Sequence, residues 1–224
     1  MPTVIAPVET PQGPGRVLID AADDPVATLL LGHGAGGGPN ATDLELLARQ
    51  MPEHGTTVVR FEQPWRAAGR RVATPPAQLD HAWLAALEWL RQEPWVRGSL
   101  FVGGRSAGAR VACRTARVVR PAGIICLAFP LHLPGRPEKS RIAELLQPQA
   151  PRLVLQGTSD AFGRPAEIQA AIKEDGGIRL VELPGADHSF RVAKSSTFTQ
   201  ADLRAALLSE VSRFVDARLG IPSP

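Results

Sequence analysis

Apolar runs of strand length alternate along the chain with segments in which apolar residues recur at helical spacing. This alternation is typical of a mainly parallel sheet with helices on both faces, so the sequence predicts an α/β fold. The predicted strands are residues 26–31, 57–61, 100–103, 123–129, 152–156 and 178–183. Residues 4–7 and 16–19 flank a turn rich in Pro and Gly, which predicts an N-terminal hairpin.

Helices are predicted between and after these strands. Capping-box spacing opens the first of them at Thr42 with Glu45 and the last at Thr199 with Asp202. The first is expected to end at Gly55 and the last at Gly220. The other predicted helices are residues 74–90, 107–119 and 165–173, with one short helix within 137–146. In the second helix an apolar stripe predicts packing in the core: Leu79, Trp83, Ala86 and Leu90.

The chain has 224 residues, of which 44% are hydrophobic and 21% charged, and these values are typical of one globular domain spanning residues 1–224. The longest apolar runs have only the length of a strand, so no membrane-spanning helix is predicted. The start Met1-Pro2-Thr3 lacks the basic and apolar pattern of a secretory signal. We therefore expect a cytoplasmic protein without a membrane partner.

Charge and cysteine content exclude several kinds of partner. The isoelectric point of about 9.4 is basic, but the formal net charge is only +3 and the arginines are spread along the chain. The pair Arg70-Arg71 is typical of a solvated surface, so no nucleic-acid partner is predicted. Cys113 and Cys126 are too few for a disulfide framework and lack metal-ligand spacing, which predicts small core residues and no metal site.

The segment 104–108 fits the pattern G-x-S-x-G and lies between an apolar strand and an apolar helix. Such a turn forces its serine into a strained backbone conformation, and the flanking glycines allow strand and helix to approach closely. The hydroxyl of Ser106 is then presented at a helix N-terminus, where backbone N–H groups favour the oxyanion formed when a carbonyl is attacked. The segment therefore predicts a nucleophile.

A serine needs a base and an orienting acid to become nucleophilic at neutral pH. Asp160 lies in the loop after strand 152–156, and His188 lies in the loop after strand 178–183. The chain order Ser, Asp, His with each residue at the end of a strand is the order that α/β-hydrolases use. We expect His188 to take the proton of Ser106 and Asp160 to orient the imidazole ring.

Other acidic and imidazole side chains offer weaker alternatives. Asp187 adjoins His188, but neighbouring loop residues seldom point the same way, so it is interpreted as a turn cap. His54 and His81 lie in predicted helices and not at strand ends, and we interpret both as surface residues.

The glycine-rich segment 32–38 follows the strand 26–31 and is expected to complete the site. In this arrangement the oxyanion is bound by the N–H of the residue after the nucleophile, here Ala107, and by one N–H of the loop after an early strand. Ala35 is the first choice for that second donor and Gly36 the next, because the sequence does not fix the register. His33 is expected to orient the loop through hydrogen bonds.

Two other functions compete with hydrolysis. Residues 32–37 also satisfy G-x-G-x-x-G after a strand, and Glu62 ends the next strand, where an acid could bind a ribose. The predicted helix, however, starts only at Thr42, so a dinucleotide phosphate would lack a helix N-terminus. The other alternative is a hydrolase-like interaction module with little activity, against which the presence of Ser106, Asp160 and His188 argues.

Four segments together resemble one branch of the α/β-hydrolases: residues 32–38, 103–110, 129–135 and 185–190. The branch is small and bacterial, akin to dienelactone hydrolases, and is similar to the hydrolase-like domains of testis-expressed protein thirty and of the third regulatory subunit of the NSL complex. The resemblance covers residues 15–218 and implies a serine hydrolase without a cofactor. Dienelactone hydrolases carry a cysteine where this chain has Ser106, so their ring-opening specificity is not implied.

About two dozen residues separate Phe129 from Arg152, where larger relatives insert a cap domain, and this length predicts an open site. Near it we expect Leu131, His132 and Phe162, although His132 is interpreted first as a structural partner of the loop. An uncapped site suits small carboxylic esters or thioesters. The expected partner is thus a small-molecule substrate, and the sequence does not indicate an oligomeric state.

Overall fold

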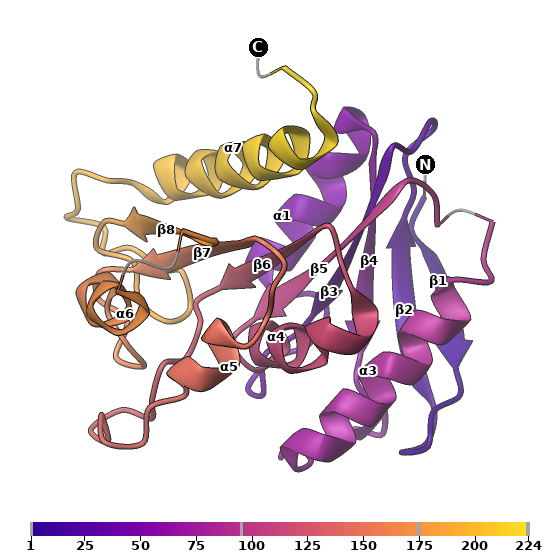
Figure 1. The fold of residues 1–224 in the computed structure, drawn as a ribbon, viewed down its shortest axis with the longest axis horizontal. Coiled ribbons are helices and arrows are strands. Elements are labelled where there is room, and N and C mark those ends of the chain that lie inside the picture. Colours follow the sequence, from indigo (N-terminus) through magenta and orange to yellow (C-terminus); the bar gives the residue numbers. More distant parts are fainter. Residues whose placement is uncertain (1, 95, 174–175, 223–224) are drawn as a thin grey trace.

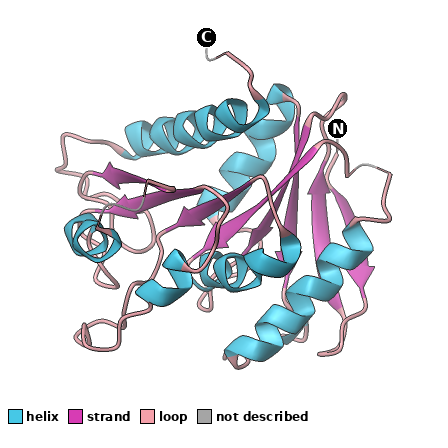
Figure 2. Ribbon diagram, in the orientation of Figure 1, coloured by secondary structure: helices cyan, strands magenta, loops and turns pink. Residues whose placement is uncertain are grey.

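A computed structural model of the chain describes residues 2–94, 96–173 and 176–222. Within these residues the chain forms a sheet of eight strands in the order β1-β2-β4-β3-β5-β6-β7-β8 (Figures 1 and 2). The strands β1 and β2 pair as the predicted hairpin, β2 runs antiparallel to β4, and all the other pairs are parallel. The strands are β1 (Val4–Val8), β2 (Gly15–Asp20), β3 (Ala27–Gly32), β4 (Thr56–Glu62), β5 (Ser99–Arg105), β6 (Gly123–Leu127), β7 (Arg152–Gly157) and β8 (Ile178–Leu183).

Helices cover both faces of the sheet, which confirms the α/β-hydrolase architecture predicted from the sequence (Figure 1). Helices α1 and α7 pack on one face, and α3, α4, α5 and α6 pack on the other. The helices are α1 (Thr42–Gln50), α2 (Pro64–Ala67), α3 (Pro76–Leu90), α4 (Ala107–Val119), α5 (Ile142–Leu146), α6 (Pro165–Ile172) and α7 (Gln200–Leu219), with the 3₁₀ turn η1 (Met51–His54) after α1. No described helix has the length and apolar character needed to span a membrane.

The alternation of side chains along the strands divides the core into two layers. In β3, Leu30 packs with Trp83 of α3 on one face, whereas Leu29 and Leu31 pack with Leu44 of α1 on the other. The predicted stripe of α3 is buried in the first layer, so its tryptophan is a core residue as expected. Both layers end at the carboxyl edge of the sheet, where the loops that carry the candidate residues emerge.

One of the two predicted capping boxes is present. Thr199 and Asp202 exchange the hydrogen bonds of a capping box at the start of α7. The box predicted at Thr42 is wrong, because the extended residue before the helix is Ala41, which has no side chain to cap it, and Thr42 is already helical.

The segment between β6 and β7 is too short to hold a cap domain. Strand β6 ends at Leu127 and not at Phe129, because Ala128 adopts a positive φ of 49° and turns the chain. In the described residues between β6 and β7, the only helix is the five-residue α5. The absence of a large cap domain therefore agrees with the prediction.

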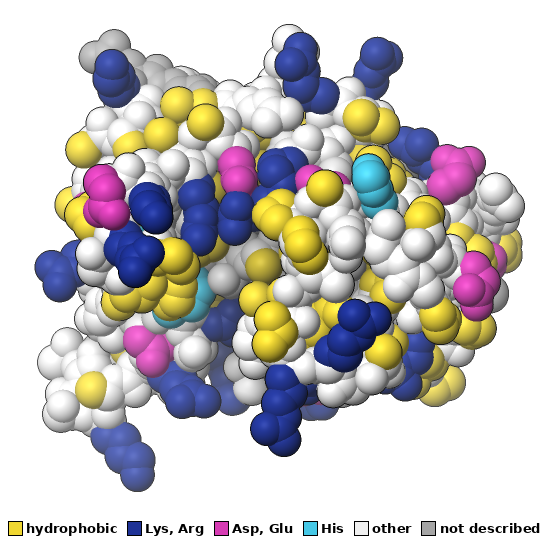
Figure 3. Space-filling model, turned by 90° about the horizontal axis from the view of Figure 1, so that it is seen from below, with side chains coloured by type: hydrophobic (Ala, Val, Ile, Leu, Met, Phe, Trp, Pro, Cys, Tyr) yellow, Lys and Arg dark blue, Asp and Glu magenta, His cyan; other side chains and the backbone are white. Residues whose placement is uncertain are grey.

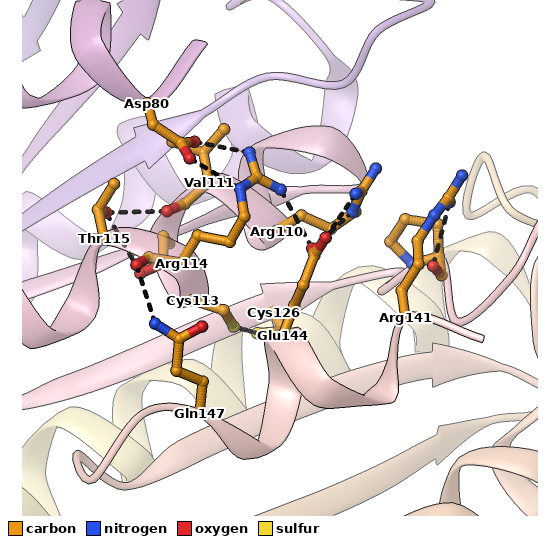
Figure 4. Close-up of polar contacts among 12 residues, drawn as sticks. Asp80, Arg110, Val111, Cys113, Arg114, Thr115, Cys126, Arg141, Glu144 and Gln147 are labelled. Atoms are coloured by element: carbon orange, nitrogen blue, oxygen red, sulfur yellow. Dashed lines mark hydrogen bonds and ion pairs between the residues drawn. The ribbon is translucent and has the colours of Figure 1, made fainter. Parts of the chain in front are cut away.

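The outer side of α4 carries a network of ion pairs (Figure 4). Arg110 and Arg114 both bind the carboxylate of Glu144 on α5, at distances of 2.6 to 3.1 Å, and Arg114 also binds Asp80 on α3. This network ties α3, α4 and α5 together on one face of the sheet. Beneath it, Cys113 and the neighbouring Cys126 are buried, as predicted for core residues.

Candidate active site

Ser106 lies in the sharp turn between β5 and α4. Its φ of 50° and ψ of −110° are the strained conformation that the G-x-S-x-G motif predicts. The glycines on either side allow this turn because a Cβ at Gly104 or Gly108 would lie 2.3 or 2.2 Å from the carbonyl oxygen of Gly32. The N–H of Ser106 donates to the carbonyl of Leu127 at 2.9 Å. Three strands therefore fix the position of this serine.

The structure brings Ser106, His188 and Asp160 into one chain of hydrogen bonds, although they come from three separate loops. The Nε2 atom of His188 lies 2.9 Å from Oγ of Ser106, and its Nδ1 lies 2.8 Å from Oδ2 of Asp160. Asp160 is buried and also accepts hydrogen bonds from the Phe162 N–H at 2.8 Å and from Nε2 of Gln156 at 2.9 Å. The ring of Phe162 stacks on that of His188 with centroids 4.1 Å apart.

This arrangement determines which imidazole nitrogen carries the proton. An ionised carboxylate only accepts hydrogen bonds, so Nδ1 of His188 donates to Asp160. Nε2 is then free to accept the hydrogen of the Ser106 hydroxyl. The geometry thus provides a base in contact with a serine hydroxyl, and an acid in contact with that base.

The loop that carries His188 is held at both ends. Asp187 accepts hydrogen bonds from the N–H groups of Ser189 and Arg191 at 2.7 and 2.9 Å, so its carboxylate caps the turn, as predicted, and does not contact the imidazole of His188.

Arg105 holds the same loop from the other side, which the sequence did not predict. Its guanidinium donates to the carbonyl of His188 and pairs with Asp43 at 3.4 Å, and it lies 5.7 Å from the centroid of the Phe190 ring. Burial raises the pKa of Asp43, and the nearby charge of Arg105 opposes that rise. Arg105 is a variable position of the G-x-S-x-G motif, and Asp43 lies in α1. No local sequence pattern indicated that these two side chains meet.

The glycine-rich loop after β3 is oriented by His33, as expected. The Nδ1 of His33 lies 2.8 Å from the carbonyl of Gly34, and its Nε2 accepts the N–H of Gln63 at 3.1 Å. Burial lowers the pKa of His33, which keeps the ring neutral at neutral pH. Neither Ala35 nor Gly36 uses its N–H in a hydrogen bond within the described residues, so both predicted donors are free.

A cavity of about 170 Å³ lies beside Ser106 and His188. Its wall also includes Ala35, Gly36 and Ser189.

The face of the molecule seen from below carries Lys and Arg side chains scattered over most of its area rather than gathered in one patch (Figure 3).

The three residues expected near the substrate lie on the Asp160 side of the site, and none of them belongs to the described wall of this cavity. Leu131 is buried, and its Cβ lies beneath Gly163. His132 contacts the carbonyl of Leu133 and the carboxylate of Glu167, so it has the structural role that was its first interpretation. Phe162 alone reaches the reacting group, through its stacking on His188.

The residues of the dinucleotide alternative have other partners. Glu62 binds Arg16 at 2.6 Å, and α1 starts at Thr42, four residues beyond the last glycine of the loop at position 38. His54 and His81 are exposed, as predicted. Glu62 does share the wall of a cavity of about 440 Å³ with Gly37 and Gly38, but Arg16, its ion-pair partner, lies in the same wall.

Solved structures resemble this fold over nearly the whole chain. An alpha/beta serine hydrolase without a lid from Xanthomonas campestris is 25% identical, with a TM-score of 0.73 over 100% of this chain and 97% of that one. A serine hydrolase homologue from Coxiella burnetii is 22% identical, with a TM-score of 0.76 and coverage of 94% and 98%. Est1E from Butyrivibrio proteoclasticus shares the fold at 14% identity, with a TM-score of 0.75 and coverage of 96% and 99%.

The family described as "Alpha/beta hydrolase domain" matches residues 25–216. This range contains the glycine-rich loop, the turn at Ser106 and the loops of Asp160 and His188. Because the match spans most of the sequence, the chain belongs to the alpha/beta hydrolase domain family.

Proposed function

We propose that the protein is a serine hydrolase that cleaves small carboxylic esters or thioesters through an acyl-enzyme on Ser106. The observation that carries the proposal is the unbroken hydrogen-bond chain from Ser106 through His188 to Asp160. The 25% identical serine hydrolase without a lid supports the same class of reaction.

In the first half of the reaction, Oγ of Ser106 attacks the carbonyl carbon of the substrate while its proton moves to Nε2 of His188. Asp160 stabilises the imidazolium that forms. The bond to the leaving oxygen or sulfur then breaks, and His188 delivers the proton to the departing alcohol or thiol. In the second half, water attacks the acyl carbon, passes one proton through His188 to Oγ of Ser106, and the carboxylic acid leaves.

The charge that develops on the carbonyl oxygen requires donors near Ser106. In our proposal these are the N–H of Ala107, at the first position of α4, and the free N–H of Ala35, with Gly36 as the neighbouring alternative. Since the first N–H groups of a helix have no partner within it, Ala107 has a donor to offer. His33 supports this role by fixing the carbonyl of Gly34.

The substrate class follows from the shape of the site. The described wall of the cavity at Ser106 includes no residue of the short segment between β6 and β7, and the cavity volume of about 170 Å³ suits a small ester better than a long lipid. All the groups in the proposed steps belong to the protein, so the mechanism uses no cofactor. The narrower resemblance to the dienelactone-hydrolase-like branch stays a prediction.

Fluorophosphonate labelling with mass-spectrometric mapping, together with hydrolysis of p-nitrophenyl acetate, tests the proposal. We expect labelling at Ser106 and loss of both labelling and hydrolysis in Ser106→Ala. Ser189→Ala is the matched control, because Ser189 also lines the cavity but its N–H, and not its hydroxyl, is the group that contacts Asp187. Hydrolysis that survives Ser106→Ala, or a folded protein that is never labelled, would favour the alternative of an interaction module.

A further inference from the structure

A second, narrow cavity lies behind the glycine-rich loop, between β3 and the helices α2, α3 and α4. It measures about 10 Å³, which is room for one water-sized group. Its wall includes both Ala35 and Ala107, whose N–H groups are the proposed oxyanion donors. The cavity beside His188 shares Ala35 with it. The two cavities therefore meet at one of the proposed donors.

Three side chains in the wall of the narrow cavity carry buried polar atoms without a partner within the described residues. These atoms are Nε1 of Trp65, Nε1 of Trp83 and Oε1 of Gln63, and none of them has a hydrogen bond within the part of the chain that the structure describes. The three side chains are at most 5% exposed, so solvent does not reach them.

The orientation of the Gln63 amide is fixed by its neighbours. Its Nε2 donates to the carbonyl of Leu79 at 3.1 Å, so turning the amide over would place oxygen against oxygen. The open atom of Gln63 is therefore an acceptor, whereas the two indoles are donors. Buried polar groups of proteins are nearly always paired, and three unpaired ones in the wall of one small cavity indicate a polar occupant.

A hydroxyl group has the complementary hydrogen-bonding capacity. Its oxygen can accept from the two indole N–H groups, and its hydrogen can be donated to Oε1 of Gln63. A methyl group of the same size can do neither. With the substrate carbonyl held at Ala35 and Ala107, which both line this cavity, a hydroxyl on the α-carbon is the polar group of an acyl chain that lies nearest to the carbonyl.

We propose that the narrow cavity is the acyl pocket and that it selects esters or thioesters of short 2-hydroxy acids, with glycolyl as the best-fitting acyl group. This proposal rests on the proposed function, because it assumes an acyl group on Ser106. Ser106 would form the hydroxyacyl ester and release the alcohol or thiol, and water would then release the 2-hydroxy acid.

The test uses phenyl glycolate and phenyl propionate, whose acyl groups differ only by a hydroxyl in place of a methyl. The ratio of their kcat/KM values is measured in the natural protein, in Trp65→Phe and in Gln63→Met. Comparing ratios between variants cancels the different intrinsic reactivities of the two esters. Trp89→Phe is the matched control, because Trp89 is a half-buried indole of α3 outside the described wall of the cavity.

We expect Trp65→Phe and Gln63→Met each to lower the glycolate-to-propionate ratio at least tenfold, and Trp89→Phe to leave the ratio unchanged. A ratio that does not change in either variant, while acetate is cleaved through Ser106, would overturn the hydroxyacyl proposal and leave the serine hydrolase intact. If no ester is cleaved and Ser106 is not labelled, both proposals fail.

Discussion

Helix α4 has two polar regions that differ in whether their hydrogen-bonding groups are paired. On its outer side, Arg110 and Arg114 both bind Glu144 of α5, and the three side chains are only 16 to 21% exposed (Figure 4). At its N-terminus, Ser106 keeps a strained backbone and the N–H of Ala107 stays available. The first region uses its charges to fix neighbouring helices, whereas the second retains groups for a reacting molecule. We therefore expect substitutions of the site's polar groups to affect catalysis, and substitutions in the ion-pair network to affect stability.

The largest effect is expected from Asp160→Asn. An amide at this position cannot hold His188 in the tautomer that accepts the serine proton, and such a change lowers kcat by about 10⁴-fold in comparable triads. Rates of p-nitrophenyl acetate hydrolysis measure the loss, and circular dichroism checks that the protein is folded. A variant that keeps more than a tenth of the rate would show that Asp160 does not orient the ring.

Gly108→Ala is expected to have the next largest effect, on stability, because Gly108 belongs to the close contact that supports both regions. Its new Cβ would lie 2.2 Å from the backbone oxygen of Gly32, which cannot move aside without breaking β3 from β5. We expect a loss of about 3 kcal/mol in the free energy of unfolding, measured by urea denaturation. Gly37→Ala is the control, since a Cβ there meets nothing within 4 Å. Equal stability of the two variants would contradict this account.

Arg105→Met tests whether the site needs support from outside the three contacting residues. Removing the donor to the carbonyl of His188 should loosen the imidazole and lower kcat by about tenfold, with KM little changed. Arg105→Lys retains a cation and should recover part of the rate. If both variants match the natural protein in kcat, the position of His188 does not depend on Arg105.

The smallest effect is expected from Glu144→Gln on the outer side. Burial alone would raise the pKa of Glu144, but the hydrogen bonds and charges of Arg110 and Arg114 outweigh it, so the pKa lies below its ordinary value of 4.5. The carboxylate therefore stabilises the fold at neutral pH, and this contribution is lost as the pH falls through the lowered pKa. We expect the variant to lose about 1 to 2 kcal/mol at pH 7, and less in acid, with unchanged esterase activity.

Glu45→Gln provides the matched control for Glu144→Gln, because Glu45 forms a single, more exposed pair with Arg49 at 3.5 Å. Urea denaturation at pH 7 and at pH 4 compares the two variants. A pH-independent loss in Glu144→Gln would show that packing, and not charge, is the source of its effect.

Local patterns were sufficient to predict most of the fold and the residues that meet at the candidate site. The turn at Ser106 was predictable because its glycines and flanking elements are adjacent in sequence, and the bounds of α4 agree with the prediction. His188 and Asp160 were found because parallel strands bring their carboxyl ends to one edge.

The features that escaped prediction depend on tertiary contacts. The Arg105 guanidinium meets Asp43 and the carbonyl of His188 across distant segments, so neither spacing nor periodicity indicated the contact. Helix α1 starts at Thr42 as predicted, but its N-cap is Ala41, so only the capping role given to Thr42 from its residue type was wrong. The sequence did not indicate that the indole N–H groups of Trp65 and Trp83 have no hydrogen-bond partner within the described residues. Apolar periodicity predicts that a side chain is buried, but not whether its polar atom is paired.

The close contact of Gly32, Gly104 and Gly108 also bears on how the protein folds. These glycines lie on β3, β5 and α4, so the strained turn at Ser106 depends on contacts that form only when distant strands pair. During refolding, α4 could gain helical structure early, while Ser106 would become reactive only when β3 and β5 come together. The rate at which fluorophosphonate labels Ser106 during refolding would therefore report how fast the sheet assembles.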